Sequence, residues 1–151
     1  MSQSETQLRD EWSLMNVAAP EGAAIFRVRT DKPDDPRIAE FATCVRIQWP
    51  YEGEVGLPSK ADAEWMDLFE SRLVDLIYGE GLSYLMLVTT GFNVKEWLFY
   101  TTGHEAFMQR FNDLVADLPR FPLEIAFIAD PQWEQWESIA QHALAAESGD
   151  E

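Results

Sequence analysis

Hydrophobic and polar residues alternate along residues 41–49 (FATCVRIQW), where one parity is mainly apolar and the other holds small or polar side chains. A period of two is typical of a β-strand with one buried face. Residues 82–89 (LSYLMLVT) are instead apolar on both parities, which is typical of a central strand. A turn at residues 90–93 predicts that residues 94–101 return antiparallel. Residues 123–128 are expected to form the last strand.

A hairpin is expected before these strands. Residues 12–17 and 24–29 are candidate strands on either side of an Ala-Pro-Glu-Gly segment, in which Pro20 and Gly22 indicate a turn. Residues 30–37 (TDKPDDPR) contain two prolines and three aspartates, and this composition predicts a loop.

Three helices are predicted from apolar residues that recur about every 3.6 positions. The first is expected over residues 59–78, where Ser59 stands at capping-box spacing from Asp62. The second is expected over residues 102–118, with Thr102 at its start and a proline after its end. The third follows an Asp-Pro pair, because Asp is a preferred N-cap and Pro is favoured at the first helical position.

The order from residue 41 to residue 128 is strand, helix, strand, strand, helix, strand. This order predicts an α+β fold with a ferredoxin-like split βαβ sandwich (a βαββαβ core), because each crossover must be right-handed. We expect the N-terminal β-hairpin to extend the sheet and the C-terminal helix to pack over an edge or the open face. The expected organisation is a disordered N-terminus over residues 1–10, one α+β domain over residues 11–146, and an acidic C-terminal tail over residues 147–151.

Charge narrows the choice of partners. The chain carries 27 acidic and 11 basic side chains, for a formal net charge of −16. Such a field repels nucleic acid and anionic membranes and attracts cationic proteins. A hydrophobic content of 46% is too high for a disordered acidic protein, so the acids are expected to cover a packed domain. The prediction is a basic protein partner, with neither nucleic acid nor membrane bound.

The cellular location expected from the sequence is cytoplasmic. The only cysteine, Cys44, has no second thiol with which to form an internal disulfide, as is usual in a reducing compartment. The polar first residues lack the apolar stretch of a signal peptide, and no apolar run reaches the length of about 18 residues that a membrane helix needs.

Few residues in the sequence are candidates for a catalytic role. Cys44 shares a strand parity with Arg46, which lowers a thiol pKa when the two side chains meet, but the favoured interpretation is a small buried residue. The histidines, His104 and His142, stand beside no recognisable nucleophile motif. The acidic loop lacks the alternating spacing of a calcium loop. We therefore predict no enzyme activity, no cofactor and no metal site.

Aromatic residues also have two interpretations. Trp97, Phe99 and Tyr100 on one strand, and Trp133 and Trp136 on one helix, form either a stacking platform or part of the core. The acidic balance argues against stacked nucleic-acid bases, since phosphate contacts supply much of that affinity. Core packing is the favoured interpretation.

Several short motifs occur together in this chain: Gly56-Leu57-Pro58, Glu64, Glu70, Thr89-Thr90-Gly91, Trp97-Leu98-Phe99-Tyr100 and Asp130-Pro131-Gln132-Trp133. In combination, from about residue 12 to residue 136, they resemble the bacterial domain of unknown function 695 (DUF695). The resemblance implies no reaction and no catalytic residue. Some family members are joined to a domain similar to the B-type regulator of ribonuclease E, an acidic inhibitor that acts by binding, and nothing in this chain resembles that second domain.

Two functions follow as expectations. The first is a non-catalytic, inhibitor-type or immunity-type protein that binds a basic partner such as a nuclease or toxin, because acidic proteins dock quickly on basic clefts. Its expected binding residues are Asp31, Asp34, Asp35, Glu64, Asp67, Glu70 and Asp75. The alternative is a regulatory or structural module that homodimerises through its sheet, in which case added salt has little effect on the complex. An enzyme needs a pocket that brings His104 or Cys44 close to several acids.

Overall fold

The computed structural model describes residues 12–19, 22–53, 56–78 and 83–148. Six strands form one sheet: β1 (Trp12–Ala19), β2 (Gly22–Arg29), β3 (Thr43–Pro50), β4 (Ser83–Gly91), β5 (Val94–Thr101) and β6 (Glu124–Ala129). The α-helices are α2 (Lys60–Tyr78), α3 (His104–Leu114) and α4 (Glu134–Ser148), and a short 3-10 helix, η1 (Ile38–Glu40), precedes β3. The predicted hairpin, strands and helices are all present.

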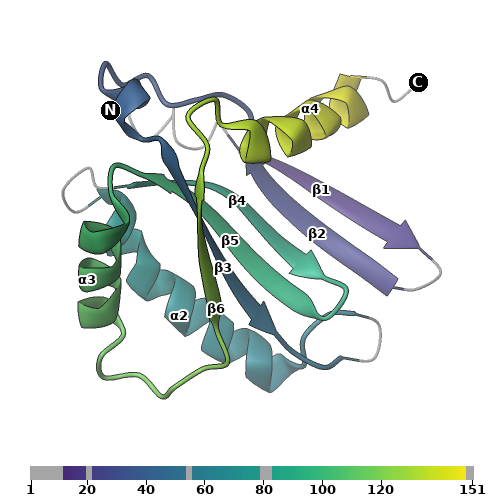
Figure 1. Cartoon of the computed structure of the whole chain (residues 1–151). Coiled ribbons are helices and arrows are strands. Elements are labelled where there is room, and N and C mark those ends of the chain that lie inside the picture. The colour runs from purple at the N-terminus through teal and green to yellow at the C-terminus, as the bar shows by residue number, and fades with distance from the viewer. Residues whose placement is uncertain (1–11, 20–21, 54–55, 79–82, 149–151) are drawn as a thin grey trace, which may run out of the picture.

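The sheet is antiparallel throughout, with the strand order β1-β2-β4-β5-β3-β6. Helix α2 connects β3 to β4, and α3 connects β5 to β6. The hairpin extends the sheet as expected, because β2 pairs with β4 in a register that sets Ile25 opposite Thr90. Strands β1 and β6 are the two edges (Figure 1).

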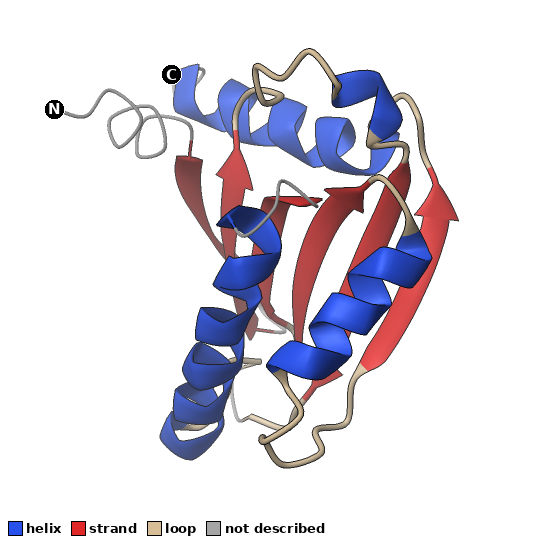
Figure 2. Ribbon diagram, turned by 90° about the vertical axis from the view of Figure 1, so that its left-hand side faces the viewer, coloured by secondary structure: helices blue, strands red, loops and turns tan. Residues whose placement is uncertain are grey.

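Helices cover both faces of the sheet. Helices α2 and α3 lie side by side on one face, and α4 crosses one end of the other face (Figures 1 and 2). The alternation of the strands accounts for these two cores. Ile47 and Phe99 pack under α2 and α3, whereas Cys44 and Leu98 pack on the side of α4.

The α+β class is confirmed. The ferredoxin-like split βαβ sandwich is not confirmed as predicted, because the hairpin enlarges the sheet to six strands and α4 adds a third layer. The predicted disordered N-terminus at residues 1–10 lies outside the described residues, as does most of the predicted tail at residues 147–151. Glu147 and Ser148 belong to α4.

Helix boundaries differ from the predictions at both ends of α3 and at the start of α4. The N-cap of α3 is Gly103 rather than Thr102, and no side chain caps it. Helix α3 ends at Leu114, before the predicted end, because Val115 leaves helical geometry. Helix α4 begins at Glu134, since Trp133 takes a left-handed φ of 59° that interrupts the helix expected directly after Asp130.

Candidate functional site

Helix α2 carries most of the acidic residues that the sequence assigned to a binding surface. Its start is fixed by Ser59, whose hydroxyl oxygen accepts a hydrogen bond from the Asp62 backbone N–H at 3.1 Å, as the capping spacing predicted. Met66, Phe69 and Leu73 are buried on the inner side. The opposite side of the helix therefore faces solvent.

The α2 outer face, defined as Glu64, Trp65, Asp67 and Leu68, mixes acidic and apolar side chains. Trp65 is 44% exposed and Leu68 is 39% exposed. Glu64 and Asp67 are exposed beside them. Lys60 lies 3.8 Å from Glu64, but this is an exposed pair of the kind that contributes little to stability. Trp65 and Leu68 stand three positions apart and so are neighbours on the helix surface, where they form a small exposed apolar patch. Such a patch beside acidic side chains makes this face a candidate contact surface.

One side of Trp65 is held against the α3–β6 connection. Its ring lies 5.7 Å from the ring of Phe121, which in turn stacks on buried Trp49 at 4.3 Å. A groove of about 350 Å³ runs along this contact and is bordered by Asp62, Trp65 and Arg120. The indole is thus positioned before any partner arrives, which lowers the entropic cost of binding.

Glu70 is separate from the α2 outer face. Its two carboxylate oxygens each accept a hydrogen bond from Arg27 Nη2 at 2.9 Å, and Trp97 Nε1 donates to Oε1 at 3.0 Å. The Glu70 side chain is 24% exposed. The structure therefore brings Glu64 and Asp67 together and directs Glu70 toward the hairpin strand β2.

The acidic loop lies at the opposite end of the sheet from the first turns of α2 (Figures 1 and 2). Asp31 and Asp34 are exposed. The Asp35 carboxylate is already hydrogen-bonded within the molecule, because it accepts from the Tyr84 hydroxyl at 2.6 Å and from the Arg37 backbone N–H at 2.8 Å. These bonds, led by that of Tyr84, lower the pKa of Asp35 to about 2. The loop and the α2 outer face do not form one patch.

Asp75, the remaining acid of the predicted surface, belongs to α2, and its side chain lies outside the described part of the structure.

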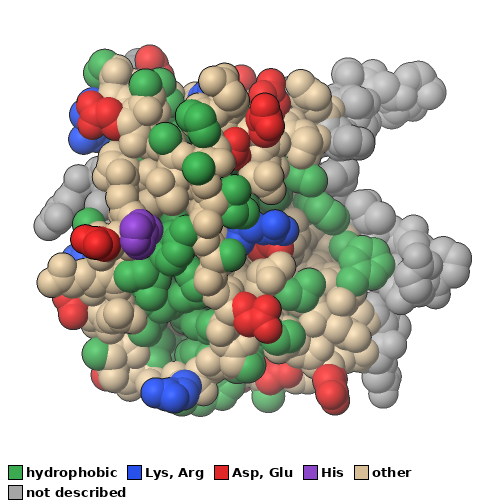
Figure 3. Space-filling view, viewed as in Figure 1, with side chains coloured by type: hydrophobic (Ala, Val, Ile, Leu, Met, Phe, Trp, Pro, Cys, Tyr) green, Lys and Arg blue, Asp and Glu red, His purple; other side chains and the backbone are tan. Residues whose placement is uncertain are grey.

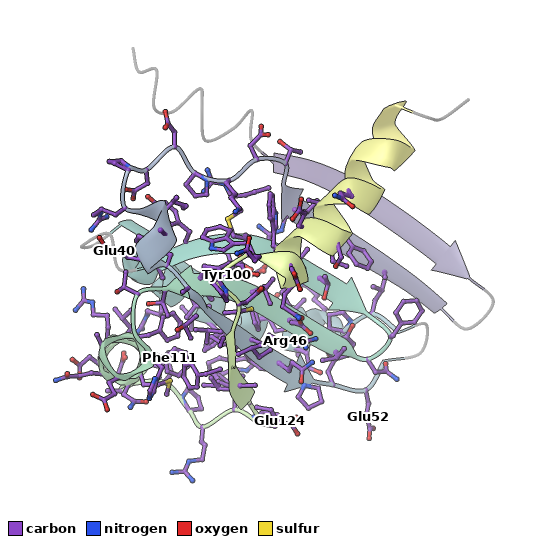
Figure 4. All side chains as sticks on the ribbon, turned by 45° about the horizontal axis from the view of Figure 1, so that its top comes forward. Glu40, Arg46, Glu52, Tyr100, Phe111 and Glu124 are labelled. Carbon is purple, nitrogen blue, oxygen red and sulfur yellow. The ribbon has the colours of Figure 1, made fainter. Side chains whose placement is uncertain are left out.

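The Cys44 side chain is packed in the core, which confirms the interpretation favoured from the sequence. It is completely buried, and burial raises its pKa to about 12. Arg46 does not activate it, because the guanidinium Nε donates to Glu96 at 3.1 Å on the part of the sheet that α4 leaves open (Figure 4). His104 is exposed, with its ring 5.2 Å from that of Phe127. Neither residue has the surroundings of a nucleophile or a general base.

The aromatic residues form core rather than a platform. Trp97, Phe99, Tyr100, Trp133 and Trp136 are all buried. This confirms the favoured interpretation and removes the stacking surface that the sequence left open.

Sequence reasoning missed a buried hydrogen-bonded cluster at the start of α4. The Tyr100 hydroxyl donates to Asp130 at 2.5 Å, and Asp130 also accepts the backbone N–H groups of Glu134 and Gln135, each at 2.9 Å. The Trp133 ring stacks on Tyr100 at 4.0 Å (Figure 4 labels Tyr100). The Asp-Pro signal identified the cap but not its tyrosine partner, which lies thirty positions earlier.

In the described ranges, no group of three or more His, Cys, Asp or Glu side chains is arranged to hold a metal ion. Within the same ranges, no helix has the length and apolar character required to cross a membrane.

These features define an α+β domain. Its most distinctive exposed surface is the α2 outer face, where acidic and apolar side chains lie next to one another. A family model of the Family of unknown function (DUF695) matches residues 10–139, and the chain belongs to that family. A search of the curated proteins gave no match.

Several motif residues of the resemblance lie in two places, while Glu64 belongs to the α2 outer face. Leu57, Pro58 and Glu70 border one cleft beside α2. Asp130 and Trp133 belong to the buried cluster on Tyr100. The first group is open to solvent and the second is structural.

Proposed function

We propose that this chain is a non-catalytic, inhibitor-type or immunity-type protein that binds a basic protein through the α2 outer face. The observation that carries the proposal is the exposure of Trp65 and Leu68 between Glu64 and Asp67. Tryptophan is enriched among the residues that dominate binding energy, and its truncation typically costs about 2 kcal/mol or more. The acids around it favour a positively charged counterpart.

The net charge of −16 supports the same partner class. A field of this sign accelerates encounter with a basic surface, such as the substrate cleft of a nuclease or a basic toxin, and disfavours nucleic acid itself. The exposed acids Asp31 and Asp34 add to the long-range field, although they lie away from the contact surface. A single buried thiol, Cys44, supports a reducing compartment such as the cytoplasm.

We also infer a ferredoxin-like unit within the larger sheet. The order β4-β5-β3-β6, with α2 and α3 on one face, supports this description of the second part of the chain. In this arrangement α2 is fixed along its inner side, which keeps the outer face rigid.

The test is affinity capture at low salt with matched charge reversals. We expect the wild-type protein to retain a strongly basic protein that is released when salt is raised. Glu64→Lys with Asp67→Lys is expected to abolish capture, and Trp65→Ala with Leu68→Ala is expected to do the same at unchanged net charge. The control is Asp113→Lys with Glu137→Lys, which changes net charge equally at exposed positions of α3 and α4 and should leave capture intact.

Three results would refute this proposal. The first is that no basic protein is retained by the wild type. The second is that the two pairs of charge reversals weaken capture equally, which would indicate net charge alone. The third is that the Trp65 and Leu68 variant binds as the wild type does.

A second candidate is homodimerisation through the sheet, and strand β6 favours it. In the described residues β6 pairs with β3 alone, so its outer edge presents unpaired backbone groups. Phe127 is 37% exposed, and apolar side chains are visible between α3 and β6 (Figure 3). Sedimentation analysis tests it: a dimer that persists at high salt and is lost in Phe127→Lys supports pairing at β6, whereas a monomer at all salt concentrations excludes it.

A further inference from the structure

A second surface feature lies where the hairpin carries the sheet beyond α2. Here a cleft of about 540 Å³ opens between β2, β4 and β5 on one side and α2 with its preceding segment on the other. Its apolar wall consists of Ile25, Leu57, Pro58 and Met66. The volume falls in the range of small-molecule sites, which are mostly apolar with a few polar groups.

Two of the charged groups in the cleft neutralise each other. Arg27 and Glu70 form the two-oxygen contact described above, with side chains 41% and 24% exposed. Trp97 Nε1 completes the hydrogen bonding of Glu70 Oε1. This pair fixes one side of the cleft and leaves little net charge there.

Lys95 is the cation that remains. Its ammonium donates to Thr90 Oγ1 at 2.9 Å and lies 5.7 Å from the centre of the Trp97 ring. Among the residues that the structure describes, Lys95 forms no ion pair within 4.0 Å of a carboxylate. An ammonium has three donors, and Thr90 takes one of them. Desolvation is the main cause that lowers the pKa of Lys95, while the carboxylates of Glu70 and Asp67 act in the opposite direction from beyond ion-pair distance.

The chemistry of the walls limits the ligand. An anion placed at Lys95 would use the remaining donors and relieve the cost of holding a desolvated cation. Asp67 borders the same cleft, so a ligand with two negative charges would be repelled more strongly than a ligand with one. The apolar wall beside the ammonium accommodates a hydrocarbon body.

We propose that this cleft binds a small monocarboxylate with an apolar body, with the carboxylate at Lys95 and Thr90 and the body against Leu57, Pro58 and Met66. The site shares only Asp67 with the α2 outer face, because Lys95 and Thr90 lie on the sheet and Trp65 borders a different groove. The Trp65→Ala with Leu68→Ala variant changes no residue of the cleft, so failure of one proposal leaves the other standing.

Hexanoate is the probe, and the full chain is titrated by calorimetry and by amide NMR. We expect saturable binding with shifts at the Thr90 and Lys95 amides. Hexanol is expected to bind at least about tenfold more weakly, since it lacks the charge-assisted bonds. Hexyl phosphate is also expected to bind more weakly than hexanoate, because its second charge near neutral pH is repelled by Asp67.

Two variants locate the site. Lys95→Met keeps the stem but removes the ammonium and is expected to weaken hexanoate binding at least about tenfold. The matched control is Lys60→Met, which removes an equal charge from a side chain that is 90% exposed outside the cleft and should leave affinity unchanged. Ala63→Leu narrows the cleft within α2, and it provides a second loss of binding should Lys95→Met fail to fold.

Several outcomes would overturn the inference. These are the absence of binding up to the solubility limit of hexanoate, equal affinity for hexanol, tighter binding of hexyl phosphate, or full binding by a folded Lys95→Met variant. Shifts confined to residues outside the cleft would overturn it as well.

Discussion

At the scale of single residues, the acids of this chain differ in what surrounds them. Glu64 and Asp67 face water, whereas Glu70 and Asp35 are occupied by hydrogen bonds within the molecule. From the sequence, all four acids were assigned to the binding surface, because the sequence does not show which distant residues form hydrogen bonds with them. Arg27, which binds Glu70, lies 43 positions away, and Tyr84, which binds Asp35, lies 49 positions away.

The Asp35 contact predicts a specific pH dependence. The pKa of Asp35 is lowered to about 2, chiefly by the Tyr84 hydroxyl. A carboxyl with a lowered folded-state pKa stabilises the fold above its unfolded pKa of about 4, and this contribution is lost as the pH falls toward about 2. In Tyr84→Phe, the unfolding free energy should therefore fall less across this pH range than it does in the wild type. Denaturant titration at several pH values measures this difference.

The control for this prediction is Tyr51→Phe. The Tyr51 hydroxyl donates to a backbone carbonyl, that of Gly56, so its removal should lower stability equally at all these pH values. If the unfolding free energy of Tyr84→Phe falls with acid as much as that of the wild type, the pH dependence does not arise from the hydrogen bond between Tyr84 and Asp35.

At the scale of elements, the periodicity of apolar residues predicted the type and order of the helices and strands better than their first and last residues. The strands at residues 41–49 and 94–101 were predictable because their side chains alternate between two cores. The early end of α3 and the late start of α4 were not, since they depend on the backbone of Val115 and Trp133. A left-handed conformation at a tryptophan is unfavourable locally, and here it accompanies complete burial of the ring against Tyr100.

The attachment of α4 gives a prediction at this scale. Tyr100→Phe removes the donor to Asp130 and the acceptor of the Trp136 backbone N–H. Because both partners are buried, we expect a loss of about 1–3 kcal/mol in unfolding free energy. Hydrogen exchange should show faster exchange in the first turn of α4 than in α2. Equal protection of that turn in variant and wild type would show that Asp130 caps α4 without the tyrosine.

The candidate site was predictable in part at the same scale. The helix over residues 59–78 and its acidic binding residues were predicted, and Glu64 and Asp67 are exposed on it. The exposure of Trp65 was not predicted, because a large apolar side chain in a helix is expected on the buried side, and of the neighbours Trp65 and Met66 only Met66 is buried. The cleft at Lys95 depends on the pairing of β2 with β4, which spacing along the chain does not reveal.

At the scale of the whole molecule, self-repulsion is the dominant long-range effect. The chain carries a formal net charge of −16 at pH 7, and the five described ion pairs engage only five of its 27 acidic side chains. Salt screens such repulsion within a Debye length of about 10 Å at 0.1 M. The compact state should therefore gain stability from added salt.

Thermal unfolding at increasing sodium chloride tests this effect. We expect the melting temperature to rise with salt at pH 7, and to rise much less at about pH 4, where the net negative charge has decreased through protonation of carboxylates. A melting temperature that falls with salt at pH 7 would show that the ion pairs outweigh the repulsion.

The pairing of β2 with β4 also determines how the chain tolerates shortening. A version starting at Thr30 would lose both hairpin strands and leave Glu70 without its arginine. It would also turn β4, an apolar inner strand, into an outer margin of the sheet, where other chains could attach by backbone pairing. Strands β1 and β2 thus shield β4 from such pairing, and a version without them is expected to aggregate more readily than the full chain.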